Sequence, residues 1–283
     1  MRLEEEKDSY MPKIDLQING KVIKIIDNGV GMTLDVLSNN FWKAGSSGKR
    51  NNDIAQRAGV IGTFGIGAMA NFGVCESLEV ITTASNKTFT YVSRAVRDDL
   101  KIGEECIDTK EEAYNGTVGT EEIANLDNNT NIDLQTCINY LKPYIEFLPI
   151  PVLINGVIYS QKSINKQYDD NAKNALHNFP TKQISHGGFK YLLDGYVLSN
   201  SFVYIKVSNL TFQDKNEDGS IILYQGATNI MCYRNYFGLS IISVCKGYNL
   251  GGSAYLSFLT PTAGRESLCR DSIAIMNSLF DTI

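Results

Sequence analysis

The sequence predicts an α+β fold made of two α/β parts, and two observations carry that prediction. Short runs of alternating apolar residues recur along the chain, and two pairs of them are joined by Asn-Gly, a strong hairpin signal. Apolar residues at helical spacing are confined to a few segments, notably 133–147 and the tail 265–280. A length of 283 residues suits one large or two ordinary domains. We expect a first domain over 1–160, a linker region over 161–185 and a second domain over 186–283.

The composition describes a globular protein with enough apolar material for a core, since 43% of the residues are hydrophobic and 20% are charged. A net charge of −5 disfavours a general nucleic-acid surface. No apolar run reaches the roughly 18 residues of a membrane span, and the acidic, polar start is not a secretion signal. The six cysteines show no Cys-x-x-Cys spacing, so we expect reduced thiols in the cytoplasm and no structural zinc.

The first hairpin leads into the most informative turn of the chain. Residues 14–18 and 22–26 form the two alternating runs around Asn19-Gly20, and the second run ends at Asp27. An aspartate held at a strand end can accept a hydrogen bond from an exocyclic amine. Gly29 and Gly31 follow, and Thr33 is then suited to cap a short helix.

A second glycine cluster lies about thirty residues further on. The segment 43–59 is polar and glycine-bearing, which predicts either a gating lid or, more simply, a surface loop. Gly62, Gly65 and Gly67 then open a helical run of small apolar residues. Glycines at a helix start can bring backbone N–H groups up to phosphates, so the two clusters suit the two ends of a nucleotide.

Neither cluster is specific alone. The glycine spacing is not the dinucleotide fingerprint, because no parallel βαβ pattern with a downstream acid surrounds it, and no Gly-Lys-Ser/Thr follows as in a Walker loop. The order strand, Asp-x-Gly-x-Gly, helix, polar segment, glycine cluster, helix is far more specific.

Further elements are predicted along the rest of the chain. Pro149 and Pro151 end the helix over 133–147, and a second Asn-Gly hairpin centres on Asn155-Gly156. The remaining strand signals are 78–83, 88–92, the surroundings of 115–118, 191–193, 202–207, 220–224 and 240–244.

Asp27 to Met32, Asn39-Asn40, Ser46-Ser47-Gly48 and the Gly62 to Gly67 cluster closely resemble motifs of the GHKL ATPase superfamily, and within it of the ninety-kilodalton heat-shock (HtpG-like) chaperone family. The resemblance implies a GHKL-type two-layer α/β sandwich with an ATP site, followed by a middle-domain-like α/β domain. Asp27 would bind the adenine amine, and Gly31 and Met32 would line the base.

The resemblance also implies the other nucleotide contacts. Asn40 would contact sugar or phosphate, and the backbone of the glycine cluster would hold phosphates. Thr117, in Asn115-Gly116-Thr117, would support the adenine through water, although Gly119-Thr120 repeats the Gly-Thr pair. The full set of residues implied in ATP or ADP binding is Asp27, Gly29, Gly31, Met32, Asn40, Ser46, Ser47, Gly62, Thr63, Phe64, Gly65, Ile66, Gly67 and Thr117.

Two later segments extend the resemblance. Residues 141–151 are similar to the helix and exit of the ATPase domain, and 259–268 to a Ser-Arg-Glu-x-Leu segment of the middle domain. The second match transfers to Arg265 a contact with the γ-phosphate, where a guanidinium would stabilise developing charge. The alternative for Arg265 is a surface charge at a helix start.

One departure from the family bears on chemistry. The family's Glu-x-x-x-Asn, which activates water and ligates Mg²⁺, has no counterpart before Asp27, where the first asparagine is Asn19. Losing the base should cost about 10²–10⁴-fold in rate. We therefore expect a fragment or truncated relative, with binding of ATP or ADP and weak or absent hydrolysis.

More than one class of function fits these features of the sequence. The first is an ATP-binding chaperone-like module with protein clients and dimerisation in a longer form. The alternative is a degenerate, non-catalytic GHKL module that regulates or binds a protein. Mismatch-repair, topoisomerase and sensor-kinase branches are further alternatives, and the acidic pI disfavours a DNA clamp.

Overall fold

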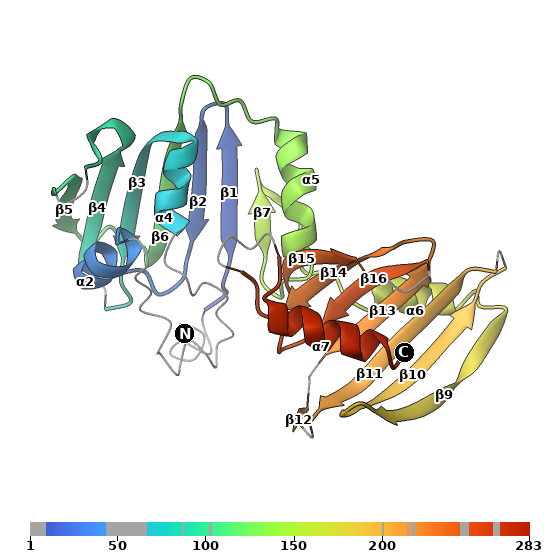
Figure 1. Cartoon of the computed structure of the whole chain (residues 1–283). Helices are drawn as coiled ribbons and strands as arrows, with labels where there is room; N and C mark the ends of the chain where they lie inside the picture. The colour runs from blue at the N-terminus through green and yellow to red at the C-terminus, as the bar shows by residue number, and fades with distance from the viewer. Residues whose placement is uncertain are drawn as a thin grey trace. The chain divides into compact units, whose positions relative to one another are not determined.

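The computed structural model describes residues 10–43, 67–86, 88–101, 104–199, 201–213, 215–216, 219–243, 249–262 and 267–283. The chain divides into two compact units. Unit 1 comprises Met1–Lys142 and Ile150–Ser160, and unit 2 comprises Pro143–Pro149 and Gln161–Ile283. Each unit is built on one large sheet with a few helices, which confirms the predicted α+β class (Figure 1).

Unit 1 contains a sheet in the order β5-β4-β3-β6-β2-β1-β7-β8. Its strands are β1 (Ile14–Asn19), β2 (Val22–Asp27), β3 (Cys75–Thr83), β4 (Phe89–Val96), β5 (Ile107–Ala113), β6 (Gly119–Leu126), β7 (Val152–Ile154) and β8 (Val157–Ile158). Its helical segments are α2 (Leu34–Val36), η1 (Leu37–Phe41), α4 (Gly67–Ala70), η2 (Asn71–Gly73) and η3 (Arg97–Asp99), while α5 (Leu134–Ile145) is shared between the units.

Both Asn-Gly hairpins form as predicted. β1 and β2 pair antiparallel, and Gly20 takes φ +58° in the loop that follows Asn19. β7 and β8 pair through Asn155 and Gly156, which have φ of 46° and 82°. Two consecutive positive φ values are the backbone requirement of a type I′ turn, which explains this choice of residues.

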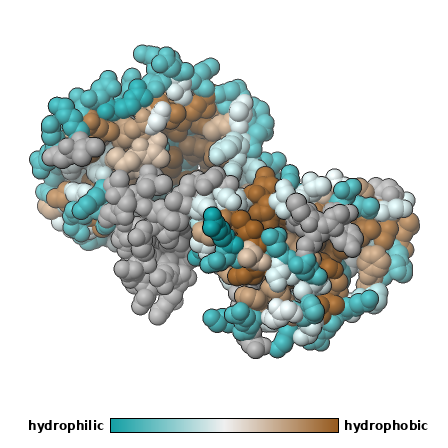
Figure 2. Space-filling model, in the orientation of Figure 1, coloured by the Kyte–Doolittle hydropathy of each residue, from teal (hydrophilic) through white to brown (hydrophobic). Residues whose placement is uncertain are grey.

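One face of the unit 1 sheet carries the core. Leu78 and Val80 on β3 and Ala95 on β4 pack against Leu37 and Trp42, with Ala68 and Phe72 completing the buried cluster. The helical segments α2, η1, α4 and η2 therefore cover this face, as Figure 1 shows for α2 and α4. In the view of Figure 2, hydrophilic residues line the outer rim of unit 1 and hydrophobic ones gather toward its middle.

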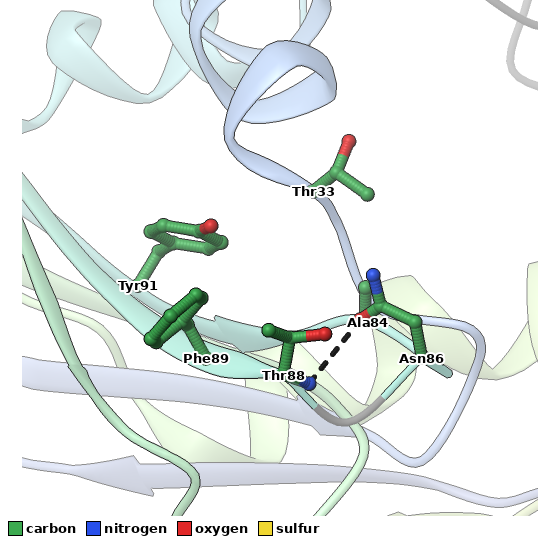
Figure 3. A pocket seen from close by; sticks show the side chains of 6 residues that line it. All are labelled: Thr33, Ala84, Asn86, Thr88, Phe89 and Tyr91. Atoms are coloured by element: carbon green, nitrogen blue, oxygen red, sulfur yellow. Dashed lines mark hydrogen bonds between the residues drawn. The ribbon is translucent and has the colours of Figure 1, made fainter.

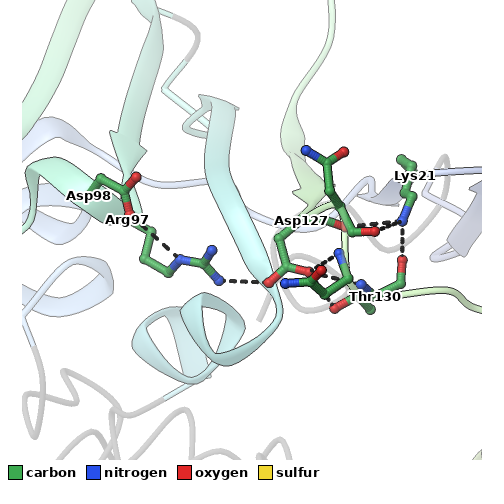
Figure 4. Close-up of polar contacts among 7 residues, drawn as sticks. Lys21, Arg97, Asp98, Asp127 and Thr130 are labelled. Atoms are coloured by element: carbon green, nitrogen blue, oxygen red, sulfur yellow. Dashed lines mark hydrogen bonds and ion pairs between the residues drawn. The ribbon is translucent and has the colours of Figure 1, made fainter.

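The end of the sheet where β6 finishes is tied by a polar clamp (Figure 4). Arg97 Nη1 donates to Asp127 Oδ2 at 2.8 Å, and Asp127 Oδ1 accepts from the N–H and hydroxyl of Thr130 at 2.9 and 2.8 Å. Lys21 Nζ donates to the carbonyls of Asp127, Asn128 and Thr130. The hydrogen bonds from Arg97 and Thr130 hold the pKa of Asp127 down to about 2, with the Arg97 hydrogen bond as the largest cause.

Unit 2 contains a sheet in the order β15-β14-β16-β13-β11-β10-β9, with β12 paired to β11. Its strands are β9 (His177–His186), β10 (Phe189–Val197), β11 (Val203–Phe212), β12 (Lys215–Asn216), β13 (Ser220–Gln225), β14 (Asn229–Arg234), β15 (Phe237–Ser243) and β16 (Leu250–Tyr255). Its helices are α6 (Lys166–Ala172) and α7 (Arg270–Phe280), and the described part of the predicted tail helix begins only at Arg270.

The helices of unit 2 contact opposite faces of its sheet. Tyr196 donates its hydroxyl to the carbonyl of Tyr168 on α6 at 2.8 Å. Tyr191 is on the same strand, an odd number of residues before Tyr196. It donates to the carbonyl of Thr282, just after α7, at 2.7 Å. Because alternate strand residues point to opposite faces, α6 and the end of α7 sandwich the sheet.

The stretch expected as a linker, 161–185, contains α6 and most of β9, and both lie in unit 2. β9 pairs with β10 alone and forms the edge of the sheet. Nearly all of its residues are exposed. This exposure explains why the edge strand has the polar composition that is expected of a connecting segment.

Among the described residues, no helix combines the length and the apolar character needed to cross a lipid bilayer.

The Asp127 clamp predicts an acid-sensitive contribution to the stability of unit 1. Because the folded pKa lies below the ordinary aspartate value, the contribution is complete above about pH 4 and is lost as the pH falls toward about 2. We expect Asp127→Asn to lower the urea midpoint at pH 7 and to differ less from the parent at pH 3. Asp108→Asn, at an exposed carboxylate 3.7 Å from Lys110, is the control and should leave the midpoint unchanged. A pH-independent loss in the Asp127 variant would contradict the ionic origin.

Candidate nucleotide site

A polar row crosses three strands at one end of the unit 1 sheet. Asp27 on β2 is directly opposite Thr120 on β6, and Thr120 is directly opposite Thr82 on β3. Directly paired residues point to the same face. Val80, two residues before Thr82, belongs to the core cluster, so this row lies on the helix-covered face, at the edge of the core.

The hydroxyls in this row are bonded to one another. Thr82 Oγ1 lies 3.1 Å from Thr120 Oγ1 and donates to the carbonyl of Gly119 at 3.1 Å. Thr82 and Thr120 are 1% and 9% exposed. A buried hydroxyl is costly without a partner, so this network keeps two polar groups in place beside Asp27.

The turn after β2 folds back on its own aspartate. Gly29 N–H donates to Asp27 Oδ1 at 2.7 Å, which closes a local Asx-type turn. Asp27 itself is half-buried. A carboxylate offers about four acceptor positions on two oxygens, and this bond fixes the orientation of the group.

Residues 30–32 close directly onto the end of β3, and we call this contact the turn closure. Ser85 N–H donates to the carbonyl of Val30 at 2.9 Å, and Met32 N–H donates to Thr82 Oγ1 at 2.9 Å. Gly31 has φ +63°, and a Cβ there would lie 1.9 Å from the carbonyl oxygen of Thr83. Only glycine permits both this backbone conformation and this approach.

Strand β6, beside this turn, begins with a glycine for the same two reasons, a positive φ and a close backbone approach. Gly119 has φ +136°, and a Cβ there would lie 2.1 Å from the carbonyl oxygen of Asp27. The start of β6 can therefore approach the end of β2 closely, which brings Thr120 level with Asp27.

The helical segment after the turn begins as predicted. Thr33 caps α2, and its Oγ1 accepts from Val36 N–H at 3.4 Å. The chain continues into the π-helical turn η1, closed by Trp42 N–H to the carbonyl of Leu37 at 3.2 Å. Trp42 Nε1 donates to Ser93 Oγ at 2.8 Å, which anchors η1, with half-buried Asn40, to the sheet.

The structure describes some of the predicted site residues and not others. Asp27, Gly29, Gly31 and Met32 lie together in the β2 turn and the turn closure, and Gly67 begins α4. The residues that fall outside the described part are Ser46, Ser47, Gly62, Thr63, Phe64, Gly65, Ile66 and Arg265, together with most of the 43–59 segment.

Thr120, and not Thr117, is the threonine beside Asp27. Thr117 is exposed, and its backbone N–H and hydroxyl donate to Asn115 Oδ1 at 3.0 and 2.8 Å. It belongs to the loop before β6, whereas Thr120 is in the strand itself. The repeated Gly-Thr pair was the signal for this alternative, but only strand pairing distinguishes the two.

Sequence reasoning missed Thr82 entirely. Its strand was predicted, but a threonine in a β-run is ordinary composition. What marks Thr82 is its simultaneous contact with Met32, Gly119 and Thr120, which joins segments far apart in the sequence.

The described residues offer an acceptor and hydroxyls, not a metal centre. In the described ranges, no three His, Cys, Asp or Glu side chains come together in a way that could hold a metal ion. A half-buried carboxylate backed by hydroxyls suits recognition of an amine or amide edge. This chemistry fits the adenine end of a nucleotide.

Comparison with known proteins supports the resemblance to the GHKL ATPases. Residues 10–128 match the family model described as histidine kinase-, DNA gyrase B-, and HSP90-like ATPase. The chaperone protein HtpG of Clostridium botulinum (strain Loch Maree / Type A3) is 28% identical over 81% of this chain. The HtpG of Bacillus subtilis (strain 168) is 29% identical over 58% of it. The resemblance to the GHKL ATPases, and to HtpG among them, is thereby confirmed.

The chain matches only part of these relatives. The aligned stretch covers 42% of the Clostridium botulinum protein and 23% of the Bacillus subtilis protein.

The turn closure predicts that alanine substitutions at Gly20 and Gly31 differ sharply in their cost to stability. Gly20→Ala also places alanine at positive φ, but nothing lies within 4 Å of its Cβ, so it should cost only about 1–2 kcal/mol. Gly31→Ala adds a backbone collision and should cost at least about 2 kcal/mol more, or prevent folding. Thermal midpoints of the two variants measure this. Equal midpoints would show that the close approach to Thr83 is absent.

Proposed function

We propose that this chain is an ATP- and ADP-binding module of the GHKL type, as residues 10–128 match the model of histidine kinase-, DNA gyrase B-, and HSP90-like ATPases. The observation that carries the proposal is the row Asp27, Thr120 and Thr82 at the turn closure. A carboxylate acceptor and two hydroxyls stand there at the edge of an apolar core, which is the chemistry that an adenine edge requires.

In this proposal, Asp27 accepts a hydrogen bond from the adenine amine. Gly29 N–H holds the carboxylate in one orientation, so little side-chain freedom remains to be lost on binding. Thr120 replaces Thr117 as the hydroxyl that supports the base, since it is directly opposite Asp27. Gly31 and Met32 line the base, and their backbone is held by Thr82 and the end of β3.

The phosphate end of the proposal rests on the resemblance. Gly62 to Gly67 would present backbone N–H groups, Asn40, Ser46 and Ser47 would contact sugar or phosphates, and Arg265 would reach the γ-phosphate. The segment 43–59 would act as a lid. Mg²⁺, which the family requires, would neutralise phosphate charge when bound.

The relatives are described as chaperones. By that likeness we propose a chaperone-like role with protein clients in the cytoplasm, and dimerisation in a longer form. For this chain on its own, we propose weak or absent hydrolysis, because no Glu-x-x-x-Asn stands before Asp27.

The nucleotide proposal predicts a thermal shift with ADP. At 100 times the dissociation constant, ADP should stabilise the fold by about 2.7 kcal/mol. Asp27→Asn should abolish the shift, because an amide in place of the carboxylate loses the charged acceptor. Thr120→Val should reduce it.

Thr117→Val is the matched control, since it removes the same hydroxyl from an exposed loop residue. It should leave the ADP response intact. An unchanged response in Asp27→Asn would refute the adenine assignment. No response in the parent chain would favour the alternative, a non-catalytic module that binds a protein partner.

A separate prediction concerns the rate of ATP hydrolysis. The purified chain with ATP and Mg²⁺ should release phosphate about 10²-fold or more below an ordinary chaperone rate, because this chain has no Glu-x-x-x-Asn before Asp27 to supply the family's general base. A phosphate-release assay measures this, with Asp27→Asn as the background. A full chaperone rate would show that another residue of this chain activates water.

A further inference from the structure

A cavity lies beside the turn closure (Figure 3). It has a volume of about 170 Å³ and is lined by Thr33, Ala84, Asn86, Thr88, Phe89 and Tyr91. These residues come from the start of α2 and from the connection between β3 and β4.

This cavity is distinct from the proposed nucleotide site. Tyr91 is directly opposite Thr82 on the β4 side, whereas Thr120 and Asp27 continue the row on the other side of Thr82. The turn closure lies directly over Thr82 and Thr83, through the Met32 bond and the Gly31 approach. The backbone of residues 30–32 therefore separates the two spaces.

One wall of the cavity is aromatic. Phe89 and Tyr91 are two residues apart on β4, so both rings face the same side, and Figure 3 shows them together. Tyr91 also packs against the core cluster, and burial and the Glu111 carboxylate raise the pKa of its hydroxyl. Phe89 is 39% exposed, which leaves a ring available to a ligand.

The opposite wall supplies a hydrogen-bond donor. Asn86 Oδ1 accepts from Thr88 N–H at 3.4 Å, and Figure 3 shows the amide nitrogen of Asn86 turned toward Thr33. Thr33 Oγ1 accepts from Val36 N–H and is turned toward the start of α2, so Asn86 is the side chain of this wall that can donate to a ligand. Among the described lining residues there is no charged side chain.

From these two walls we propose that the cavity binds a single planar aromatic ring carrying a neutral carbonyl acceptor, such as an aromatic carboxamide. An enclosed apolar cavity of about 150 Å³ holds benzene in another protein. This cavity is of similar volume but open to solvent, since Thr33, Asn86, Thr88 and Phe89 are exposed, so it has room for one ring with a small substituent. The ring would stack on Phe89 and Tyr91, and the carbonyl would accept from the Asn86 amide. The claim that this site is separate from a nucleotide site rests on the proposed function.

Benzamide is the probe, followed by ligand-observed NMR titration of the full chain. Cyclohexanecarboxamide keeps the carboxamide without the aromatic ring and should bind markedly more weakly. Asn86→Asp keeps the acceptor for Thr88 N–H but removes the amide donor, and should weaken benzamide at least about tenfold. Asn178→Asp makes the same change on exposed β9 and should leave binding unchanged.

Saturating ADP tests the separation of the two sites. Benzamide should bind with ADP present, and competition between them would overturn the proposal. Equal binding by cyclohexanecarboxamide, equal binding by Asn86→Asp, or no benzamide binding to the parent chain would also overturn it. The ADP thermal shift is read on the same samples, so a failure of the nucleotide proposal is recognised independently. Benzamide binding without an ADP response would leave the cavity site standing alone.

Discussion

The arrangement of unit 1 depends on one close approach of backbone to backbone. Residues 30–32 lie on the end of β3 because Gly31 has no side chain, and a Cβ there would be 1.9 Å from the carbonyl oxygen of Thr83. The approach lets Met32 N–H reach Thr82 and brings the chain to Thr33, where α2 begins. The proposed nucleotide site and the cavity of Figure 3 both lie beside this contact.

The polar row of Asp27, Thr120 and Thr82 lies at the edge of the apolar core, where burying a polar group costs free energy unless it is hydrogen-bonded. Thr82 and Val80 are on the same face of β3, and Val80 belongs to the core cluster. Thr82 is 1% exposed, and its hydroxyl is satisfied by Met32, Gly119 and Thr120. A satisfied polar network inside an apolar face holds one geometry, because each displaced member leaves a buried group without a partner.

Unit 2 illustrates the limit of composition as a guide to organisation. A stretch with few large apolar residues was expected to be a linker, and it contains α6 and the edge strand β9. The buried side chain of α6 is Tyr168, whose ring packs on Tyr196 and whose hydroxyl donates to Asp194. An edge strand and a short helix bury little of their own surface, so their residues resemble those of a loop.

The local elements could be predicted from the sequence because their causes are local. Asn-Gly predicts a hairpin through its tolerance of positive φ, Thr33 predicts a helix start through its side-chain oxygen, and the glycine motifs predict the resemblance to the GHKL ATPases. Only the tertiary structure decided that Thr120 and not Thr117 stands beside Asp27, that Thr82 joins them, and that a cavity lies beside the turn. Those three facts depend on which strands are neighbours and in what register, and register is set by long-range packing that no short stretch of sequence contains.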